Sequence, residues 1–383
     1  MNIFLILEMN QLPDDVFSII IPFMTNHFNF SISCKRFNKL FKRHAIFSGI
    51  QLFKGFKKPL PDNMLENIII NDIYKNKLSR LRVILYLIQY GKNDLVKLLL
   101  KKIDIDLTFD KNNAIITAVK YNNYEIVKLL LSDSKVNKTA PYYNIILIAV
   151  IIGNVEIVKL LISKIATYRY EYICYLATKN NHYKIVKFMT SYMNFDVSTC
   201  LYIAAEKGNI EIVKLLLSCP DNNPGCWKNQ AICNSTRFGH YKITKLLLKD
   251  PRVDPSDLNN HSIRYAAKNG HYKIVKLLLS DSRVDPSDQD NEAIRFAAEN
   301  GHHEVVKILL SDKRVDPTVD NNYPIRIASD NGHYEIIKLL LTDKRVDPTV
   351  NDNIAIRWAI IKKYHKVVDL LMTDERVKST FKC

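Results

Sequence analysis

Three consecutive segments of this chain are variants of one 31-residue sequence, and this repetition constrains the fold more than any other feature. The segments span residues 260–290, 291–321 and 322–352. Their alignment gives columns of one residue type: Ala266, Ala297 and Ala328; Gly270, Gly301 and Gly332; Lys276, Lys307 and Lys338; Pro286, Pro317 and Pro348. A fixed period of this size predicts stacked units that each pack mainly against their neighbours. Function then has to be sought on the surface of the array.

Each unit is predicted to be a helix, a tight turn, a second helix and a polar loop. The first helix carries a small residue such as Ala266, which lets helix axes approach closely. In the Gly270 column only glycine and asparagine occur before the last unit, and both tolerate the left-handed conformation that ends a helix. The apolar second helix follows, as in Ile274–Leu279, and an Asp-Pro sequence then forms the loop.

The same columns extend over most of the chain and predict an all-α solenoid of about ten units. The units are expected at 81–111, 112–142, 143–170, 171–197, 198–228, 229–259, 260–290, 291–321, 322–352 and 353–383. The two units between Tyr143 and Val197 are shorter than the others and have lost loop residues. Residues 1–45 are expected to form a small helical module and residues 46–80 a connector.

Several polar columns predict local interactions. Asn260 and its equivalents stand at the start of the first helix, where their side chains can cap free amides. Arg283 and its equivalents could pair with the aspartates of the Val-Asp sequence, such as Asp285. A second arginine column consists of Arg264, Arg295, Arg326 and Arg357 on the first helix. These columns have two interpretations: repeat architecture, or an electropositive groove for an acidic protein.

The unit resembles the ankyrin repeat, and the segment Gly270–Leu279 matches the central motif of that family. The first helix departs from it, because the family's Thr-Pro-Leu-His is replaced by sequences such as His261-Ser262-Ile263-Arg264. The resemblance implies a concave binding surface made by loop tips and first helices. The positions there that vary between units are Asp257, Leu258, Lys268, Asp288, Gln289, Glu299, Val319, Asp320, Asp330, Val350 and Asn351.

The N-terminal segment 12–41 resembles an F-box, which in its family docks a Skp-type adaptor of cullin–RING ubiquitin ligases. The resemblance rests on a Leu-Pro-acidic opening, an apolar helix and a Cys-Lys-Arg sequence before an aromatic residue. It implies adaptor contacts by Leu12, Pro13, Phe17, Cys34, Lys35, Arg36 and Phe37. Phe37 departs from the family, which usually has tryptophan there. Together the two halves resemble ankyrin proteins of giant DNA viruses of amoebae.

The chain is basic, with a formal net charge of +16. One interpretation is an AT-rich genome, because Ile, Lys, Asn and Tyr are all abundant. The other is attraction to nucleic acid or acidic partners. Glutamates three residues before the lysine column, such as Glu211 before Lys214, predict intrahelical ion pairs that neutralise this face. The tyrosines after the turn, such as Tyr272, are explained by packing. Nucleic acid is therefore not the expected partner.

We expect no enzyme activity, cofactor or metal site. The chain contains no nucleotide-binding or nucleophile motif. Histidines one repeat apart, such as His271 and His302, lie about 10 Å apart and cannot share a zinc ion, so they are interpreted as turn residues that tie loops together. An odd number of cysteines, seven, favours a reducing compartment. The absence of a signal peptide and of a long apolar run predicts a cytoplasmic protein outside the membrane. We also expect a monomer.

These observations predict a non-enzymatic protein-interaction solenoid. The array would hold a target while residues 12–41 dock a Skp-type adaptor. The alternative is a plain ankyrin scaffold or decoy without a ligase link. A third interpretation is a basic protein associated with nucleic acid. The sequence does not identify the target, because repeat surfaces carry no readable partner code.

Overall fold

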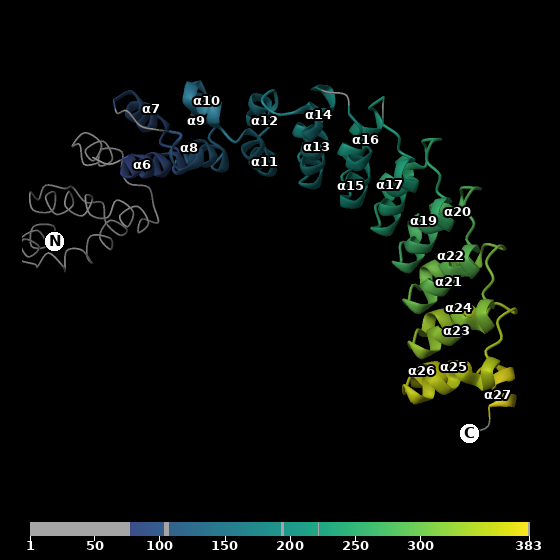
Figure 1. Ribbon diagram of the computed structural model, residues 1–383. Coiled ribbons are helices and arrows are strands. Elements are labelled where there is room, and N and C mark those ends of the chain that lie inside the picture. Colours follow the sequence, from purple (N-terminus) through teal and green to yellow (C-terminus); the bar gives the residue numbers. More distant parts are fainter. Residues whose placement is uncertain (1–76, 103–106, 193–194, 221, 382–383) are drawn as a thin grey trace, which may run out of the picture. The chain divides into compact units, whose positions relative to one another are not determined.

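The computed structural model describes residues 77–102, 107–192, 195–220 and 222–381, and every regular element within these ranges is a helix. The chain divides into two compact units, residues 1–167 and 168–383. The predicted all-α solenoid of helix–turn–helix repeats is confirmed, and Figure 1 shows the helices following one another in pairs. The N-terminal segment predicted to resemble an F-box lies outside the described residues.

In the described part of the first unit the helices form three pairs and one short connecting helix. The pairs are α6 (Lys77–Gln89) with α7 (Asn93–Lys102), α8 (Phe109–Lys120) with α9 (Tyr124–Ser132), and α11 (Tyr142–Ile152) with α12 (Val155–Ile162). The short helix α10 (Ser134–Thr139) lies between the second and third pairs. Helix α6 thus begins inside the segment expected to be a connector.

The described part of the second unit contains seven pairs. They are α13 (Tyr170–Lys179) with α14 (Tyr183–Tyr192), α15 (Ser198–Lys207) with α16 (Ile210–Leu217), α17 (Cys226–Arg237) with α18 (Tyr241–Leu247), α19 (Asp257–Lys268) with α20 (Tyr272–Leu279), α21 (Asp288–Glu299) with α22 (His303–Leu310), α23 (Val319–Asp330) with α24 (Tyr334–Leu341), and α25 (Val350–Ile361) with α26 (His365–Leu371). A 3-10 helix, η1 (Thr167–Arg169), precedes α13, and α27 (Glu375–Thr380) follows α26. From α15 to α25 each first helix packs against the next, and the second helices pack in a parallel layer.

The alanine column lies in the core, as predicted. Ala266, Ala297 and Ala328 are fully buried, because each first helix is packed between its neighbours and its own second helix. Isoleucine, leucine and valine side chains from both helices fill the remaining space and form one continuous core from Ile263 to Val377. Burial of each such side chain stabilises the array by about 1.5–3 kcal/mol. The second unit is therefore held together by neighbour-to-neighbour packing.

The turn between the two helices is closed by the histidine of the following repeat. Gly270 has a φ of +76°, and a Cβ atom at this position would lie 2.7 Å from Nδ1 of His302. Nε2 of His302 lies 2.9 Å from the carbonyl oxygen of Lys268 in the preceding repeat. His240, His271 and His333 make the same bond to the residue 34 positions earlier. The prediction that turn histidines tie the loops together is confirmed.

The loop contains a feature that the sequence did not predict, a left-handed turn of three non-glycine residues. Leu258, Asn259 and Asn260 have φ of 55°, 55° and 54°, and each of the next three repeats has the same turn. Left-handed backbone costs L-residues about 1–2 kcal/mol each, least for asparagine and aspartate. Such a turn persists only where surrounding contacts stabilise it.

The asparagine column supplies one of these contacts, by joining each first helix to the loop that leads into the next helix pair. In the structure a repeat is therefore counted from that loop, so that Asp285 and Asp288 belong to the repeat of α21 and Asn260 to the repeat of α19. Asn260 is buried; its Oδ1 accepts the backbone N–H of Asp285 at 2.8 Å, and its Nδ2 donates to Asp288 at 2.8 Å. Asn229, Asn291 and Asn322 accept the equivalent N–H of the next repeat. The prediction that these asparagines cap their own helix is wrong, because their oxygens face the following repeat.

The arginines before the loop make a second connection. Arg283 donates to both carboxylate oxygens of Asp281, at 2.9 and 2.7 Å, and to the carbonyl oxygen of Val253 in the preceding repeat at 2.7 Å. The expected pairing with Asp285 is wrong, since the Asp285 carboxylate accepts the N–H and hydroxyl of Ser287. The hydrogen bond from Arg283 lowers the pKa of Asp281.

Candidate functional site

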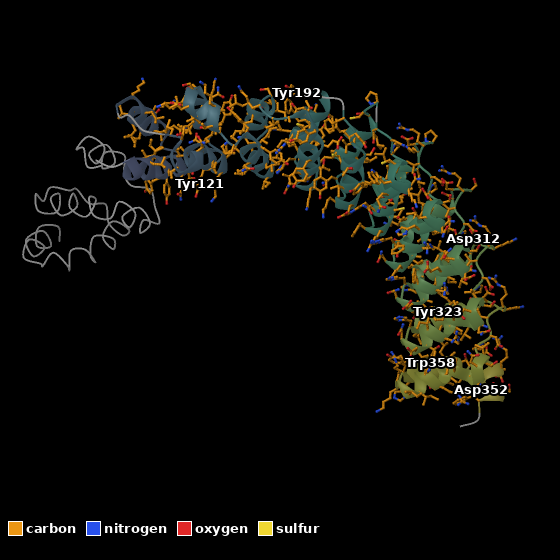
Figure 2. The ribbon with its side chains drawn as sticks, in the orientation of Figure 1. Tyr121, Tyr192, Asp312, Tyr323, Asp352 and Trp358 are labelled. Carbon is orange, nitrogen blue, oxygen red and sulfur yellow. The ribbon has the colours of Figure 1, made fainter. Side chains whose placement is uncertain are left out.

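Aromatic side chains line the first helices of the second unit. Tyr265, Phe296 and Trp358 occupy one column, and Tyr323 lies four residues before the Ile327 position of that column. All four are half-buried, and the rings of Tyr265 and Phe296 meet edge to face with centroids 6.3 Å apart. Figure 2 shows Tyr323 and Trp358 on the side of the first helices, away from the loop that contains Asp312. We call these four residues the aromatic row.

Cations lie over the rings of the aromatic row. Lys268 Nζ is 4.6 Å from the centroid of Phe296 and 5.7 Å from that of Tyr265. The guanidinium of Arg237 is 5.5 Å from the Tyr265 ring. Each such contact stabilises by about 0.5–1 kcal/mol at an exposed site. The row therefore presents apolar ring edges bordered by positive charge, a combination that is typical of protein-binding surfaces.

The arginine column of the first helices has a structural role. Arg264 and Arg295 donate to the carbonyl oxygens of Leu258 and Gln289, at 3.2 and 3.1 Å. Arg326 donates to the carbonyl oxygen of Asp320 at 2.8 Å. In each case the acceptor is the first residue of the left-handed turn. These three arginines thus stabilise the strained turn, as the architectural interpretation predicted, and Arg264 also pairs with Glu292 of the next repeat.

The predicted contact residues at the loop tips have unequal exposure. Asp257 and Asp288 are half-buried, and each accepts a hydrogen bond from the asparagine of the preceding repeat, at 3.0 and 2.8 Å. Leu258, Val319 and Val350 are also half-buried, whereas Gln289, Asp320 and Asn351 are exposed. The two aspartates therefore join repeats, and the exposed tips remain available to a partner.

The predicted residues at the ends of the first helices lie beside the aromatic row. Lys268 is half-buried over Phe296, Glu299 is exposed, and Asp330 pairs with Lys362 at 3.1 Å. The structure thus brings Lys268 together with the row. Leu12, Pro13, Phe17, Cys34, Lys35, Arg36 and Phe37 lie outside the described residues.

The aromatic row itself was missed by the sequence analysis. Its signal is present, since the column of Tyr265, Phe296 and Trp358 contains Ile327 and Asn234 in other repeats. A packing position would keep one size and polarity across units. The mixture of aromatic, aliphatic and polar residues marks a position that packing does not determine.

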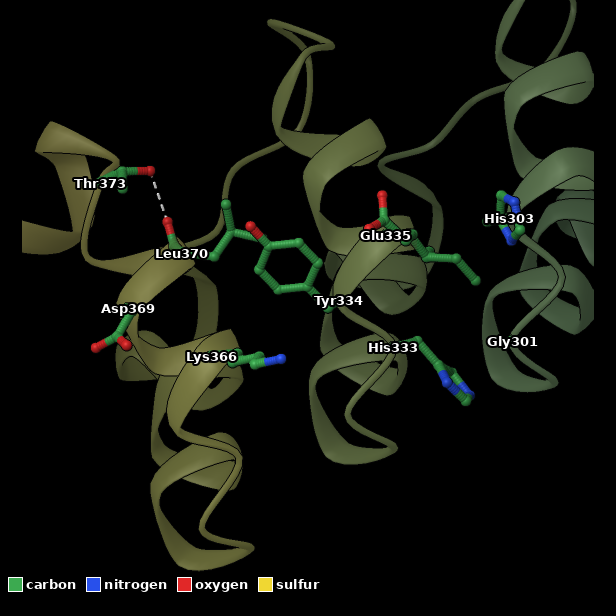
Figure 3. Close-up of a pocket in the computed structure, with 10 residues that line it drawn as sticks. Gly301, His303, His333, Tyr334, Glu335, Lys366, Asp369, Leu370 and Thr373 are labelled. Atoms are coloured by element: carbon green, nitrogen blue, oxygen red, sulfur yellow. Dashed lines mark hydrogen bonds between the residues drawn. The ribbon is translucent and has the colours of Figure 1, made fainter.

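A pocket of about 790 Å³ lies on the second-helix side, between α22, α24 and α26 (Figure 3). It is lined by Gly301, His303, His333, Tyr334, Glu335, Ile336, Lys366, Asp369, Leu370 and Thr373. The Thr373 hydroxyl donates to the carbonyl oxygen of Leu370 at 2.6 Å, and Nε2 of His333 lies 3.1 Å from the carbonyl oxygen of Glu299. Both groups are engaged by backbone and are not arranged as a nucleophile and its base.

Over the described residues, no group of three or more His, Cys, Asp or Glu side chains has a metal-binding arrangement. The buried thiols of Cys174 and Cys233 are held protonated by their surroundings. Burial raises the pKa of Cys233 to about 11, and the neighbouring Cys200 and burial raise the pKa of Cys174. Protonated thiols are poor nucleophiles and poor metal ligands. None of the described helices is long and apolar enough to cross a membrane.

The comparisons with known proteins identify the class of repeat. The family model for ankyrin repeats in three copies matches residues 61–141, 176–259, 201–290, 263–352 and 294–380, which together exceed half of the chain. The chain belongs to the ankyrin repeat family, whose repeats serve as protein–protein interaction scaffolds.

Other comparisons add little. An ankyrin repeat family protein from Legionella pneumophila, known from an X-ray structure, is 15% identical, and the match covers 85% of this chain and 93% of that one. Its TM-score of 0.28 is too low to support any argument about geometry. Comparison with curated proteins gave no match.

Proposed function

We propose that the chain recruits a protein partner to the first-helix face of its second unit. The observation that carries the proposal is the aromatic row, because half-buried rings beside Lys268 and Arg237 offer apolar area and charge at one surface. Aromatic residues and arginine dominate the binding energy of protein interfaces. The Ala and Gly columns are needed for packing and turns, and the His and Asn columns bond successive repeats. The aromatic row and the exposed loop tips are therefore the positions left for recognition of a partner.

We further propose that residues 12–41 link this partner to a Skp-type adaptor of a cullin–RING ubiquitin ligase. This part of the proposal rests on the resemblance of that segment to an F-box. The bound partner would then be presented for ubiquitin transfer by the ligase, and this chain would supply only binding.

The face is tested by partner capture with matched variants of the full chain. The double variant Tyr265→Ala/Phe296→Ala should lose the captured partner, whereas Tyr121→Ala/Tyr183→Ala, which removes two exposed rings elsewhere, should retain it. A truncated aromatic anchor typically weakens binding by about 2 kcal/mol or more. Equal capture by both variants would contradict the proposed face.

The ligase link is tested with a purified Skp-type adaptor. The intact chain should bind the adaptor and a chain that lacks residues 1–45 should not. If the intact chain does not bind, the ligase link is wrong and a plain scaffold or decoy remains. Neither result depends on the aromatic row.

A further inference from the structure

Five lysines gather on two adjacent second helices, on a different face from the aromatic row. Lys242 and Lys245 belong to α18, Lys249 follows its end, and Lys273 and Lys276 belong to α20. All five side chains are exposed, and the two helices pack side by side. We call these five residues the lysine patch.

The charge of the lysine patch is uncompensated within α18 and α20, unlike that of the corresponding lysines in α16 and α12. In α16, Glu211 holds the position that Lys242 and Lys273 hold, and it pairs with Lys214 at 2.8 Å. In α12, Glu156 pairs with Lys159 at 2.9 Å in the same way. Within the described residues none of the five patch lysines forms an ion pair, so the neutralisation expected from the sequence does not extend to α18 and α20.

The carboxylates that directly follow α18 and α20 are already engaged. Asp250 and Asp281 follow α18 and α20, and each is bound at 2.7 Å by the arginine two residues later. Hydrogen bonds from these arginines lower the pKa of both carboxyl groups. The lysines therefore have no acidic partner to turn to within the two repeats.

A groove between α18 and α20 gives the patch its shape. It has a volume of about 410 Å³ and is lined by Lys245, Leu248, Lys249, Leu277, Ser280, Asp281 and Ser282. Tyr241 and Tyr272, at the starts of the two helices, are 37% and 42% exposed. Tyr272 thus packs only in part, and the rest of the residue is exposed. Ammonium groups thus stand beside apolar and hydroxyl-bearing surface.

Glutamates set the limits of the patch. Glu211 on α16 and Glu304 on α22 occupy the lysine position in the repeats on either side. With helix axes about 10 Å apart, the positive surface is roughly 20 Å wide. A nucleic-acid backbone that continued beyond this width would meet negative charge on both sides, whereas about six extended residues of peptide fit within it.

We propose that the lysine patch binds a short acidic segment of a partner protein. Glutamate and aspartate carboxylates of the segment pair with the five ammonium groups, and its apolar side chains contact Leu248 and Leu277 in the groove. Lysine suits this role because a flexible ammonium acts as a point charge and needs no fixed geometry. This site does not depend on the proposed first-helix face or on residues 12–41.

The experiment uses the full chain and a fluorescein-labelled six-residue peptide of alternating glutamate and leucine, followed by fluorescence anisotropy. The test variant is Lys242→Glu/Lys273→Glu, which installs the residue that native repeats carry at Glu211 and Glu304. The fold is expected to tolerate it, because an acidic residue in the first turn favours a helix. Binding should weaken about tenfold or more at low salt, and added salt should reduce the difference.

The matched control is Lys184→Glu/Lys366→Glu. It makes the same charge change at the same helix position in α14 and α26, outside the patch. The control variant should bind the peptide with an affinity within about twofold of that of the parent chain, because salt screens its introduced charges at their distance from the patch. Equal weakening by both variants would overturn the proposal, since the attraction would then be that of overall charge. Tight binding of a twenty-nucleotide single-stranded DNA with none of the peptide would also overturn it.

Discussion

The helix–helix turns of successive repeats are joined to one another by different side chains in the two units. In the first unit asparagines meet: Nδ2 of Asn123 donates to Asn93 at 2.6 Å, and Nδ2 of Asn154 donates to Asn122 at 2.5 Å. From Gly208 to Gly301 in the second unit, a histidine ring lies over the glycine of the preceding turn. Glycine is thus required twice over in the second unit, for its positive φ and for its missing Cβ. At Gly91 in the first unit only the φ of +68° requires it, because no atom lies within 4 Å of an added Cβ.

The loops differ in a second way, which a single residue type explains. In the first unit Lys138 stands where the second unit has Pro286, and the segment forms the short helix α10. Proline lacks an N–H and disfavours helix before it, so the loops of the second unit that contain this proline are not helical. Asn112 still reaches the next repeat, by donating to the carbonyl oxygen of Thr139 at 3.0 Å. The asparagine column therefore joins repeats in both units, whatever the loop conformation.

The largest expected effect comes from the glycine column. Gly270→Ala should lower the free energy of unfolding by about 3 kcal/mol, from left-handed strain and overlap with the His302 ring. Gly91→Ala should lower it by about 1 kcal/mol, from strain alone. Urea unfolding followed by circular dichroism measures both. When the ring is removed by His302→Ala, adding Gly270→Ala should lower the free energy of unfolding only by the left-handed strain, as Gly91→Ala does. Equal losses of free energy for Gly270→Ala and Gly91→Ala would contradict the difference between the two units.

The asparagine column should give the next largest effect. Asn291→Ala loses the bond to the Asp316 N–H and places alanine at a φ of 53°, so unfolding should become easier by about 2–3 kcal/mol. Asn291→Gly keeps the left-handed backbone accessible and should lose about 1 kcal/mol less. The same denaturant titration separates them. If both substitutions cost the same, the turn is not strained.

Acid should destabilise the second unit through its arginine–aspartate bonds. Hydrogen bonds from Arg283, Arg314 and Arg345 lower the pKa of Asp281, Asp312 and Asp343 below its ordinary value. A carboxyl group whose pKa is lower in the folded chain than in the unfolded chain stabilises the fold at any pH above the unfolded pKa of about 3.9. This stability is lost as the pH falls through the folded pKa.

Thermal unfolding between pH 7 and pH 3 should therefore show a loss below about pH 4. The loss should be smaller in a variant with methionine at positions 283, 314 and 345. Each bond contributes less than about 1 kcal/mol, because the arginines are partly exposed. An unchanged pH profile in the triple variant would argue against these pairs.

The smallest predicted effect is a gain in the free energy of unfolding, obtained by placing in the first unit an arginine that the second unit has at the same position. Asp133 already accepts the N–H of Lys135 at 2.8 Å, as Asp312 accepts that of Arg314 at 3.0 Å. Lys135→Arg should add a guanidinium–carboxylate bond and raise the free energy of unfolding by up to about 0.5 kcal/mol. Lys135→Gln is the control that should not gain. A loss in the arginine variant would show that α10 does not permit the bond.

The sequence predicted the fold because its strongest columns act locally or by packing. Ala266 and Gly270 specify a close helix contact and a left-handed turn, and both can be recognised one residue at a time. The partner that a side chain bonds in another repeat cannot be recognised in this way. Asn260 looks like a helix cap in the sequence, but its oxygen bonds to Asp285, 25 residues later. Arg283 was assigned Asp285, although Asp281 lies equally near in the chain.

The candidate surfaces were harder to predict for a related reason. The aromatic row is formed by residues from separate repeats, so Tyr265 and Trp358 have no local motif that links them. The lysine patch depends on which helices lack a glutamate, and only adjacent helices, α18 and α20, make that lack into a surface. Variation within a column was the right signal, but it had to be combined with exposure before it marked a site.

The central claim is that the loop columns of the second unit join repeats and so leave the first-helix face for a partner. Residue-resolved hydrogen exchange of the full chain tests it most directly. The backbone amides of Asp285, Asp316 and Asp347 donate to asparagines of the preceding repeat at 2.7–2.8 Å, although they lie in loops. We predict that they exchange as slowly as the amides of the flanking helices. Exchange at the rate of an open loop would contradict the account.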